Sequence, residues 1–215
     1  TDKCYENNGQ LVGYKENDSM GGYDPYSSSK GCAELVSASY RKSFFDEMGV
    51  SIATARAGNV IGGGDWAKNR IIPDAIRAFV NNRKLLVRNP DSVRPWQHVL
   101  EPLLGYLMLC QKLINKPNEY SGAWNFGPNK EDAKSVSIIA DIVAKSWGGS
   151  AQWQQDNDNY HHEANYLKLD CTKAKNVLKW KPIWSLDSAL VETVKWYKAL
   201  YNDEDMNKFT VNQIK

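Results

Sequence analysis

Apolar residues recur three or four positions apart along several stretches of this chain, which is the spacing of the buried stripe of an amphipathic helix. Serine or threonine stands where three of these stretches begin, and glycine stands where two of them end, as is common at helix termini. The pattern predicts helices over residues 26–48, 70–79, 101–113, 135–147, 172–178 and 185–201.

Shorter apolar runs between these helices predict strands. Residues 50–56 carry apolar side chains at alternate positions, which suits a strand in a covered sheet. Further short strands are predicted over residues 85–87, 93–99, 124–127 and 166–169. The alternation of helix and strand is typical of an α/β protein. Three polar stretches are predicted to lie outside this framework: a surface loop over residues 6–20, a loop over 152–165 and a partly disordered tail over 202–215.

The composition is sufficient for a sizeable hydrophobic core, and it argues against nucleic-acid and membrane partners. Of 215 residues, 42% are hydrophobic, which is ample for one large domain or two small ones. The net charge is only +2 and the basic residues are spread out, so no nucleic-acid-binding face is expected. No apolar run approaches the ~20 residues that span a bilayer, and no signal peptide opens the chain. The expectation is a cytoplasmic protein with no membrane partner.

The cysteines and histidines give no indication of a metal site. The four cysteines lie far apart and never in a CxxC spacing, so we expect reduced and mostly buried thiols. His161 and His162 are adjacent, and adjacent side chains do not point the same way, so their segment is interpreted as a loop or ligand contact. The cysteines are Cys4, Cys32, Cys110 and Cys171.

Candidate chemistry lies at the predicted start of the first helix, in the sequence GGYDPYSSSK over residues 21–30. Tyr26 and Lys30 are one helical turn apart on the same face. An ammonium beside a phenol stabilises the phenolate, so such a tyrosine can exchange a proton with a substrate hydroxyl or carbonyl. The three serines between them leave room for a ligand against the helix. The alternative is an exposed tyrosine and lysine on an ordinary helix, because the pattern is short and common.

A glycine-rich segment, AGNVIGGGDW over residues 57–66, follows the first predicted strand. Glycine permits tight turns and a close approach of the backbone to a ligand. No Lys-Ser or Lys-Thr pair follows, so the segment is not a phosphate loop of the Walker type.

Several motifs, taken in order, resemble a known family. They are Thr1-Asp2-Lys3, Tyr26-x-x-x-Lys30, RAGNVIG over residues 56–62, Arg94-Pro95-Trp96 and WNFGP over residues 124–128. Together they are similar to the nucleotide-sugar branch of the extended short-chain dehydrogenase/reductases, and the resemblance runs essentially from end to end. Within the 4,6-dehydratases of that branch, Asp2-Lys3 and the segments YDPYSSSKGCAEL and HEANYLKLD most resemble the members that act on CDP-glucose.

The resemblance implies a fold in two parts. Residues 1–60 would be the remaining, C-terminal part of a Rossmann-type parallel sheet that binds NAD. Residues 61–215 would mainly form a smaller mixed α/β domain that binds the nucleotide sugar, with some segments returning to the Rossmann domain.

The resemblance also implies a tightly held NAD that is reduced and reoxidised within one turnover. Tyr26 would take the proton of the sugar 4-hydroxyl, Lys30 would stabilise the phenolate and contact the nicotinamide ribose, and Thr1 would hydrogen-bond the substrate hydroxyl. Val60 would be a further cofactor contact. Oxidation at C4 acidifies the C5 hydrogen, water leaves from C6, and hydride returns to C6. The product would be CDP-4-keto-6-deoxyglucose, a compound of deoxysugar biosynthesis such as that of O-antigen.

The elimination of water needs an acid and a base. Asp2 matches the family acid that protonates the departing 6-hydroxyl, which requires surroundings that keep this carboxyl protonated. Lys3 stands where related dehydratases carry a glutamate as the C5 base. A lysine is a base only in its neutral form, which burial or a positive neighbour favours. Otherwise Lys3 has an electrostatic role and another group is the base.

Further residues match family positions that contact the nucleotide diphosphate or the sugar. Arginine suits that task because its fork is bidentate and its charge permanent, although a solvated surface charge is the alternative for each arginine taken alone. The five candidates are Asn59, Arg70, Arg94, Asn125 and His162.

The family's glycine-rich dinucleotide motif lies upstream of the Thr1 strand, and no GxGxxG or GxxGxxG occurs in these 215 residues. The expectation is a piece of a longer protein, inactive by itself because most of the adenine half of the cofactor site is missing. Relatives pair through the helix that carries Tyr26, which implies a homo-oligomer, a dimer or tetramer. Two alternatives stay open: a sister epimerase or reductase, which would not need Asp2, and a catalytically silent nucleotide-binding domain.

Overall fold

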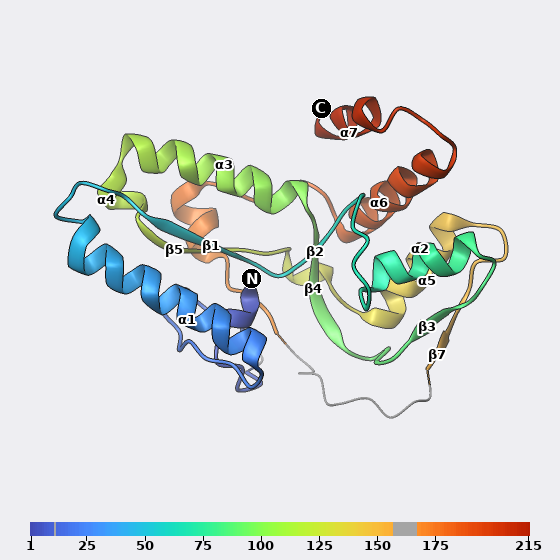
Figure 1. Cartoon of the computed structure of the whole chain (residues 1–215), viewed down its shortest axis with the longest axis horizontal. Coiled ribbons are helices and arrows are strands. Elements are labelled where there is room, and N and C mark those ends of the chain that lie inside the picture. The colour runs from blue at the N-terminus through green and yellow to red at the C-terminus, as the bar shows by residue number, and fades with distance from the viewer. Residues whose placement is uncertain (11, 157–166) are drawn as a thin grey trace. The chain divides into compact units, whose positions relative to one another are not determined.

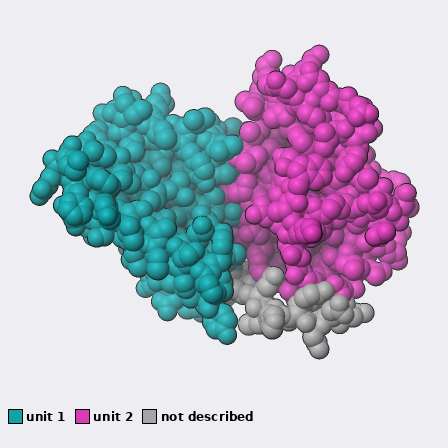
Figure 2. Space-filling model, in the orientation of Figure 1, with its two compact units in different colours: residues 1–58, 101–129, 164–183 teal, residues 59–100, 130–163, 184–215 magenta. Residues whose placement is uncertain are grey.

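The structure, a computed structural model, describes residues 1–10, 12–156 and 167–215. The chain folds into two compact units, each assembled from three separate stretches (Figure 2). Unit 1 comprises residues 1–58, 101–129 and 164–183, and unit 2 comprises residues 59–100, 130–163 and 184–215.

A parallel pair of strands forms the centre of unit 1. β1 (Ala53–Ala57) pairs with β5 (Gly122–Phe126), between α1 (Pro25–Tyr40) on one face and α3 (Leu100–Asn115) on the other (Figure 1). Alternate side chains of β1 explain the two faces, because Ala53 and Ala55 pack into the apolar cluster below α3 whereas Thr54 and Arg56 bond to α1. Smaller elements are η1 (Asp2–Cys4), the π-helical turn η2 (Arg41–Phe45), α4 (Pro117–Tyr120) and η4 (Ala174–Leu178).

The core of unit 1 is aromatic. Trp124, Phe126 and Trp180 are almost wholly buried, and the rings of Phe126 and Trp180 meet edge to face at 5.1 Å between centroids. Gly105 lets α3 approach this cluster, because a Cβ at Gly105 would lie 2.4 Å from Cε1 of Phe126.

Unit 2 contains two small sheets covered by helices. β2 (Asn59–Ile61) runs parallel to β4 (Val93–His98), β4 runs antiparallel to β6 (Ala133–Ser135), and β3 (Leu85–Val87) runs parallel to β7 (Trp153–Gln155). The apolar faces of α2 (Ile71–Val80), α5 (Val136–Trp147) and α6 (Leu186–Tyr201) fill its core, and η3 (Lys130–Asp132) and α7 (Met206–Ile214) complete the unit. Fully buried members of the core include Ile76, Ile139, Val143, Leu190 and Tyr197.

The long helices are confirmed within about two residues of their predicted ends, because caps and apolar spacing act locally. Ser135 and Ser185 cap α5 and α6 as predicted, each accepting a backbone N–H three residues on. The first helix is shorter than predicted, since its regular part ends at Tyr40 and the π-helical turn η2 follows. The first strand likewise begins at Ala53 rather than at residue 50.

The predicted disordered tail is wrong: residues 206–214 form α7. Asp205 caps this helix, and contacts with α6 hold it, because Trp196 Nε1 donates to Thr210 Oγ1 at 2.9 Å and Gln213 Nε2 donates to the Glu192 carbonyl at 3.0 Å. Sequence periodicity within these nine residues, of which five are polar, could not reveal these tertiary bonds.

Four smaller expectations also need correction. Only Cys4 and Cys171 are buried, whereas Cys32 and Cys110 are exposed. The predicted surface loop over residues 6–20 contains a buried residue, Tyr14, whose ring stacks on Tyr5 at 5.2 Å. Asp170, not the predicted Thr172, accepts the first amide of the short helix, from Thr172 N at 2.8 Å. The predicted loop over 152–165 includes β7, and residues 157–165 lie outside the described ranges.

Within the described ranges, no helix combines the length and the apolarity that crossing a membrane requires.

Candidate active site

The turn before α1 puts Tyr26 and Lys30 at the helix start, as predicted. Pro25 occupies the first helical position, and Asp24 caps the helix by accepting hydrogen bonds from the Ser27 amide at 3.0 Å and the Ser27 hydroxyl at 2.6 Å. These bonds hold the pKa of Asp24 below its ordinary value. Lys30 Nζ lies 5.3 Å from the centre of the Tyr26 ring, and both side chains are exposed.

The three serines between Tyr26 and Lys30 stabilise this helix start. The Ser27 hydroxyl bonds to the cap, the Ser28 hydroxyl donates to the Gly22 carbonyl at 2.9 Å, and the Ser29 hydroxyl donates to the Tyr26 carbonyl at 2.7 Å. The helix start is thus tied to the preceding turn, and the predicted room for a ligand stays a prediction.

Thr1, Asp2 and Lys3 lie at η1, which packs against α1. The approach is close: Gly21 N donates to the Cys4 carbonyl at 3.0 Å, and a Cβ at Gly31 of α1 would lie 3.2 Å from the same oxygen. Thr1 Oγ1 accepts the Lys3 amide at 3.3 Å and so caps η1. Asp2 is buried, with 2% of its surface exposed, whereas Thr1 and Lys3 are exposed. Unit 1 therefore carries all five predicted catalytic residues on two elements in direct contact.

Four predicted ligand-contacting residues belong to unit 2. Asn59 and Val60 lie on β2, and Arg94 lies on β4 with its guanidinium buried and donating to the Val93 carbonyl at 3.1 Å. Arg70 is exposed and pairs with Asp65 at 2.9 Å. Their roles toward a ligand stay predictions, and His162 lies outside the described residues.

Asn125 is hydrogen-bonded inside unit 1. It is fully buried, its Nδ2 donates to the carbonyls of Tyr14 at 2.9 Å and Asp170 at 3.2 Å, and its Oδ1 accepts the Tyr5 hydroxyl at 2.7 Å. These bonds join three segments of unit 1, and the role of Asn125 as a substrate contact stays a prediction.

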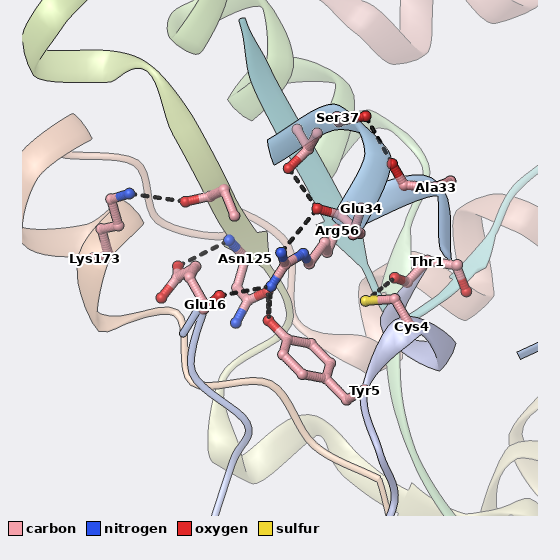
Figure 3. A network of polar contacts seen from close by, with 12 residues as sticks. Thr1, Cys4, Tyr5, Glu16, Ala33, Glu34, Ser37, Arg56, Asn125 and Lys173 are labelled. Atoms are coloured by element: carbon pink, nitrogen blue, oxygen red, sulfur yellow. Dashed lines mark hydrogen bonds and ion pairs between the residues drawn. The ribbon is translucent and has the colours of Figure 1, made fainter. Parts of the chain in front are cut away.

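A buried polar network joins α1, β1 and the chain that follows η1, and it was not predicted (Figure 3). Arg56 Nη2 pairs with Glu34 Oε2 at 2.8 Å, and Arg56 Nη1 donates to the Tyr5 hydroxyl at 2.7 Å. Two features of the sequence could have indicated it: Glu34 follows Lys30 by one helical turn, and Arg56 is the one charged residue in the strand ATARA.

Interactions within this network favour the charged forms of Glu34 and Arg56. Burial opposes ionisation of Glu34, but the hydrogen bonds from Arg56 and Thr54 outweigh burial and hold the pKa of Glu34 below its ordinary value. The pKa of Arg56 is raised by Glu34 and Tyr5 despite its burial. Burial raises the pKa of Tyr5, so its hydroxyl keeps the proton that it donates to Asn125.

A helix-borne Tyr–Lys pair beside a parallel α/β sheet defines a protein of the short-chain dehydrogenase/reductase type. The sequence profile of the family described as GDP-mannose 4,6 dehydratase matches residues 1–193, and the chain belongs to this family.

Individual relatives refine the comparison. CDP-glucose 4,6-dehydratase of Salmonella typhimurium is 54% identical over 211 residues, which are 96% of this chain and 59% of that protein. dTDP-glucose 4,6-dehydratase of Streptomyces antibioticus is 23% identical, over 81% of this chain and 49% of that protein. The chain thus spans between about half and three fifths of the length of these relatives.

Solved structures share the Rossmann-type α/β fold. dTDP-glucose 4,6-dehydratase from Bacillus anthracis, in complex with NAD, has a TM-score of 0.73 at 21% identity, covering 95% of this chain and 61% of that one. UDP-glucuronic acid 4-epimerase from Bacillus cereus has a TM-score of 0.79 at 20% identity, covering 94% and 60%. At these identities the likeness concerns the fold.

Proposed function

We propose that this chain forms the catalytic and sugar-binding part of an NAD-dependent CDP-glucose 4,6-dehydratase, a lyase that yields CDP-4-keto-6-deoxyglucose. The observation that carries the proposal is the 54% identity to the Salmonella enzyme over 96% of the chain. The much lower identity of 23% to a dTDP-glucose enzyme favours the cytidine nucleotide as substrate.

The residues of unit 1 fit the nicotinamide end of NAD. Among the described residues, neither the Tyr26 hydroxyl nor the Lys30 ammonium has a hydrogen-bond partner, and both are exposed at the start of α1. A phenol and an ammonium in this position can meet a sugar hydroxyl and a ribose together. Val60, on β2, would be a further cofactor contact.

The side chains of this chain divide the reaction between them. Bound NAD would accept a hydride from sugar C4 and return it to C6, which is chemistry that no side chain supplies. Tyr26 would take the proton of the 4-hydroxyl, with Lys30 stabilising the phenolate and Thr1 holding the same hydroxyl. Asp2 would give a proton to the departing 6-hydroxyl, which leaves as water. Lys3 would accept the C5 proton and return it to C5 as hydride reaches C6, or it would have an electrostatic role while another group accepts and returns that proton.

Further parts of the proposal concern binding and assembly. Unit 1 would provide most contacts to NAD, to which Val60 of unit 2 would add one, and unit 2 would provide most contacts to the nucleotide sugar through Asn59, Arg70 and Arg94, with His162. Asn125 of unit 1 would be a further sugar contact. The protein would be cytoplasmic and would act as a dimer or tetramer. The oligomer is supported by a group of exposed apolar side chains on α1 and η2, because burial of such a group in an interface removes apolar surface from water. They are Leu35, Val36, Tyr40 and Phe44.

The test uses the full-length gene product that contains this sequence, incubated with CDP-glucose deuterated at C4. The expected product is a 4-keto-6-deoxy sugar whose methyl group carries the deuterium, as read by proton NMR, because hydride moves from C4 to C6 within one molecule. Tyr26→Phe should abolish the reaction in a protein with unchanged circular dichroism. An inverted sugar without a methyl group would indicate the epimerase alternative, and no product would indicate the silent one.

A further inference from the structure

A buried ion pair joins α1 to the sheet one turn after Lys30. Arg56 of β1 is 4% exposed, Glu34 of α1 has 15% of its side chain exposed, and their charged atoms lie 2.8 Å apart. The Thr54 hydroxyl donates to the same carboxylate oxygen at 2.8 Å. Thr54 and Arg56, two residues apart on the same face of β1, therefore bind one carboxylate of α1. These two contacts fix the position of the helix along its axis.

The other side of the same guanidinium holds the chain that leaves η1. Arg56 Nη1 donates to the Tyr5 hydroxyl at 2.7 Å and to the Glu16 carbonyl at 3.0 Å. Tyr5 directly follows η1, and its ring lies 5.0 Å from the guanidinium carbon. The Tyr5 hydroxyl is fixed in turn by Asn125 Oδ1 at 2.7 Å.

We propose that Arg56 is a positioning residue for the dehydratase reaction. Its guanidinium, held between Glu34 and Tyr5 (Figure 3), sets η1 with Asp2 and Lys3 against the start of α1 with Tyr26 and Lys30. The inference rests on the proposed function. It assigns Arg56 no contact with substrate, because both Nη nitrogens bond to protein groups and Nε is buried.

The geometry of arginine explains why this residue stands here. Its planar fork presents N–H groups from two nitrogens in fixed directions, one toward Glu34 and one toward Tyr5, whereas the N–H donors of a lysine ammonium all lie on one rotating nitrogen. The reaction alternates between the two elements, because C4 oxidation uses Tyr26 and water loss uses Asp2. A shift of about 1 Å in a reacting group can cost roughly 100-fold in rate, so a rigid tie between the elements matters for turnover.

Arg56→Lys is the central variant, since it keeps the buried charge and removes the fork. We expect kcat to fall roughly 10- to 100-fold with KM changed less than about threefold, because positioning is lost while the substrate contacts remain. The deuterium isotope effect of C4-labelled CDP-glucose should rise as hydride transfer becomes rate-limiting. Glu34→Gln should also lower kcat with little change in KM. Glu119→Gln breaks an exposed ion pair of unit 1, Lys116–Glu119, and should leave turnover unchanged.

Thiol labelling provides a readout that is independent of activity. Cys4 precedes Tyr5 and is 1% exposed, and its burial raises its pKa to about 11, so it should react slowly until η1 loosens. Cys171 is buried elsewhere in unit 1 and reports general unfolding. In Arg56→Lys we expect Cys4 to be labelled roughly 10-fold faster or more, with Cys171 still protected.

The outcomes separate this inference from the proposed function. A wild-type protein that does not dehydrate CDP-glucose overturns the proposed function. An active wild type with unchanged kcat in Arg56→Lys overturns the positioning role, whatever the labelling of Cys4. Equal exposure of Cys4 and Cys171 in the variant also overturns it, because Arg56 would then hold the whole unit and not the two catalytic elements.

Discussion

Asp2 carries the elimination half of the proposed reaction, and its place on η1 separates it from the oxidation half on α1. Asp2→Asn keeps the size of the side chain and removes the acidic proton that the leaving hydroxyl requires. We expect this variant to oxidise CDP-glucose at C4 and to accumulate reduced cofactor, measured by its near-ultraviolet absorbance, without forming the 6-deoxy product. Normal product formation by Asp2→Asn would contradict the role of Asp2 as the acid.

His98 of β4 provides a prediction about stability. It is 2% exposed, its Nδ1 accepts the Leu100 amide at 3.4 Å, and its ring lies 4.6 Å from Trp184. Burial lowers the pKa of His98 from 6.5 to about 4, and the charge of Glu192 on α6 opposes this shift only in part. Between pH 6.5 and about pH 4, His98 is therefore neutral in the folded protein and protonated in the unfolded chain.

The sign of the pH dependence follows from this difference. The contribution of His98 to stability is complete above pH 6.5 and declines as the pH falls toward about 4, because the unfolded chain binds the proton first. Between pH 7 and pH 5 the free energy of unfolding should fall by about 2 kcal/mol on account of this residue. Urea titrations at both pH values measure the loss, and His98→Gln should remove it. An equal loss in His98→Gln would assign the effect to other groups.

At the scale of the element, the cap of α1 controls the order of the turn that carries Tyr26. Asp24→Ala removes both hydrogen bonds to Ser27, so the first turn should fray and kcat should fall roughly 3- to 10-fold. Hydrogen exchange of the Ser27 and Ser28 amides should accelerate in the same variant. Asp24→Asn is the matched control, since asparagine caps equally well and should restore slow exchange. Fast amide exchange together with normal turnover in Asp24→Ala would show that the cap does not contribute to catalysis.

The sequence predicts the helices better than it predicts the contacts between elements. Apolar spacing and side-chain caps are local, and they predicted α2, α5 and α6 closely. The Arg56 network depends on contacts between residues far apart in sequence, since Tyr5 is 51 positions from Arg56 and 120 from Asn125. A motif marks Asn125 as notable without telling whether its amide faces a ligand or the core. Its bonds to Tyr5, Tyr14 and Asp170 come from tertiary packing, which a local motif does not encode.

At the scale of the whole molecule, the two units can be followed separately. All four cysteines belong to unit 1, so thiol labelling reports on that unit alone. Of the eight tryptophans, Trp124 and Trp180 belong to unit 1 and the rest belong to unit 2, so indole fluorescence reports mainly on unit 2. Two probes present in the native sequence thus distinguish units that the chain builds from interleaved segments.

These probes test the proposed division of binding between the units. A ligand that binds only the folded state at about 100 times its Kd adds about 2.7 kcal/mol to the stability of the part that binds it. In the full-length gene product, with any tryptophan outside these 215 residues replaced by phenylalanine, CDP-glucose should therefore raise the urea midpoint of indole fluorescence more than that of Cys171 labelling, and NAD should do the reverse. dTDP-glucose at the same concentration is the matched control and should shift the fluorescence midpoint less. If CDP-glucose protected Cys171 alone, the sugar would be bound by unit 1, and the assignment of Asn59, Arg70 and Arg94 as its contacts would be wrong.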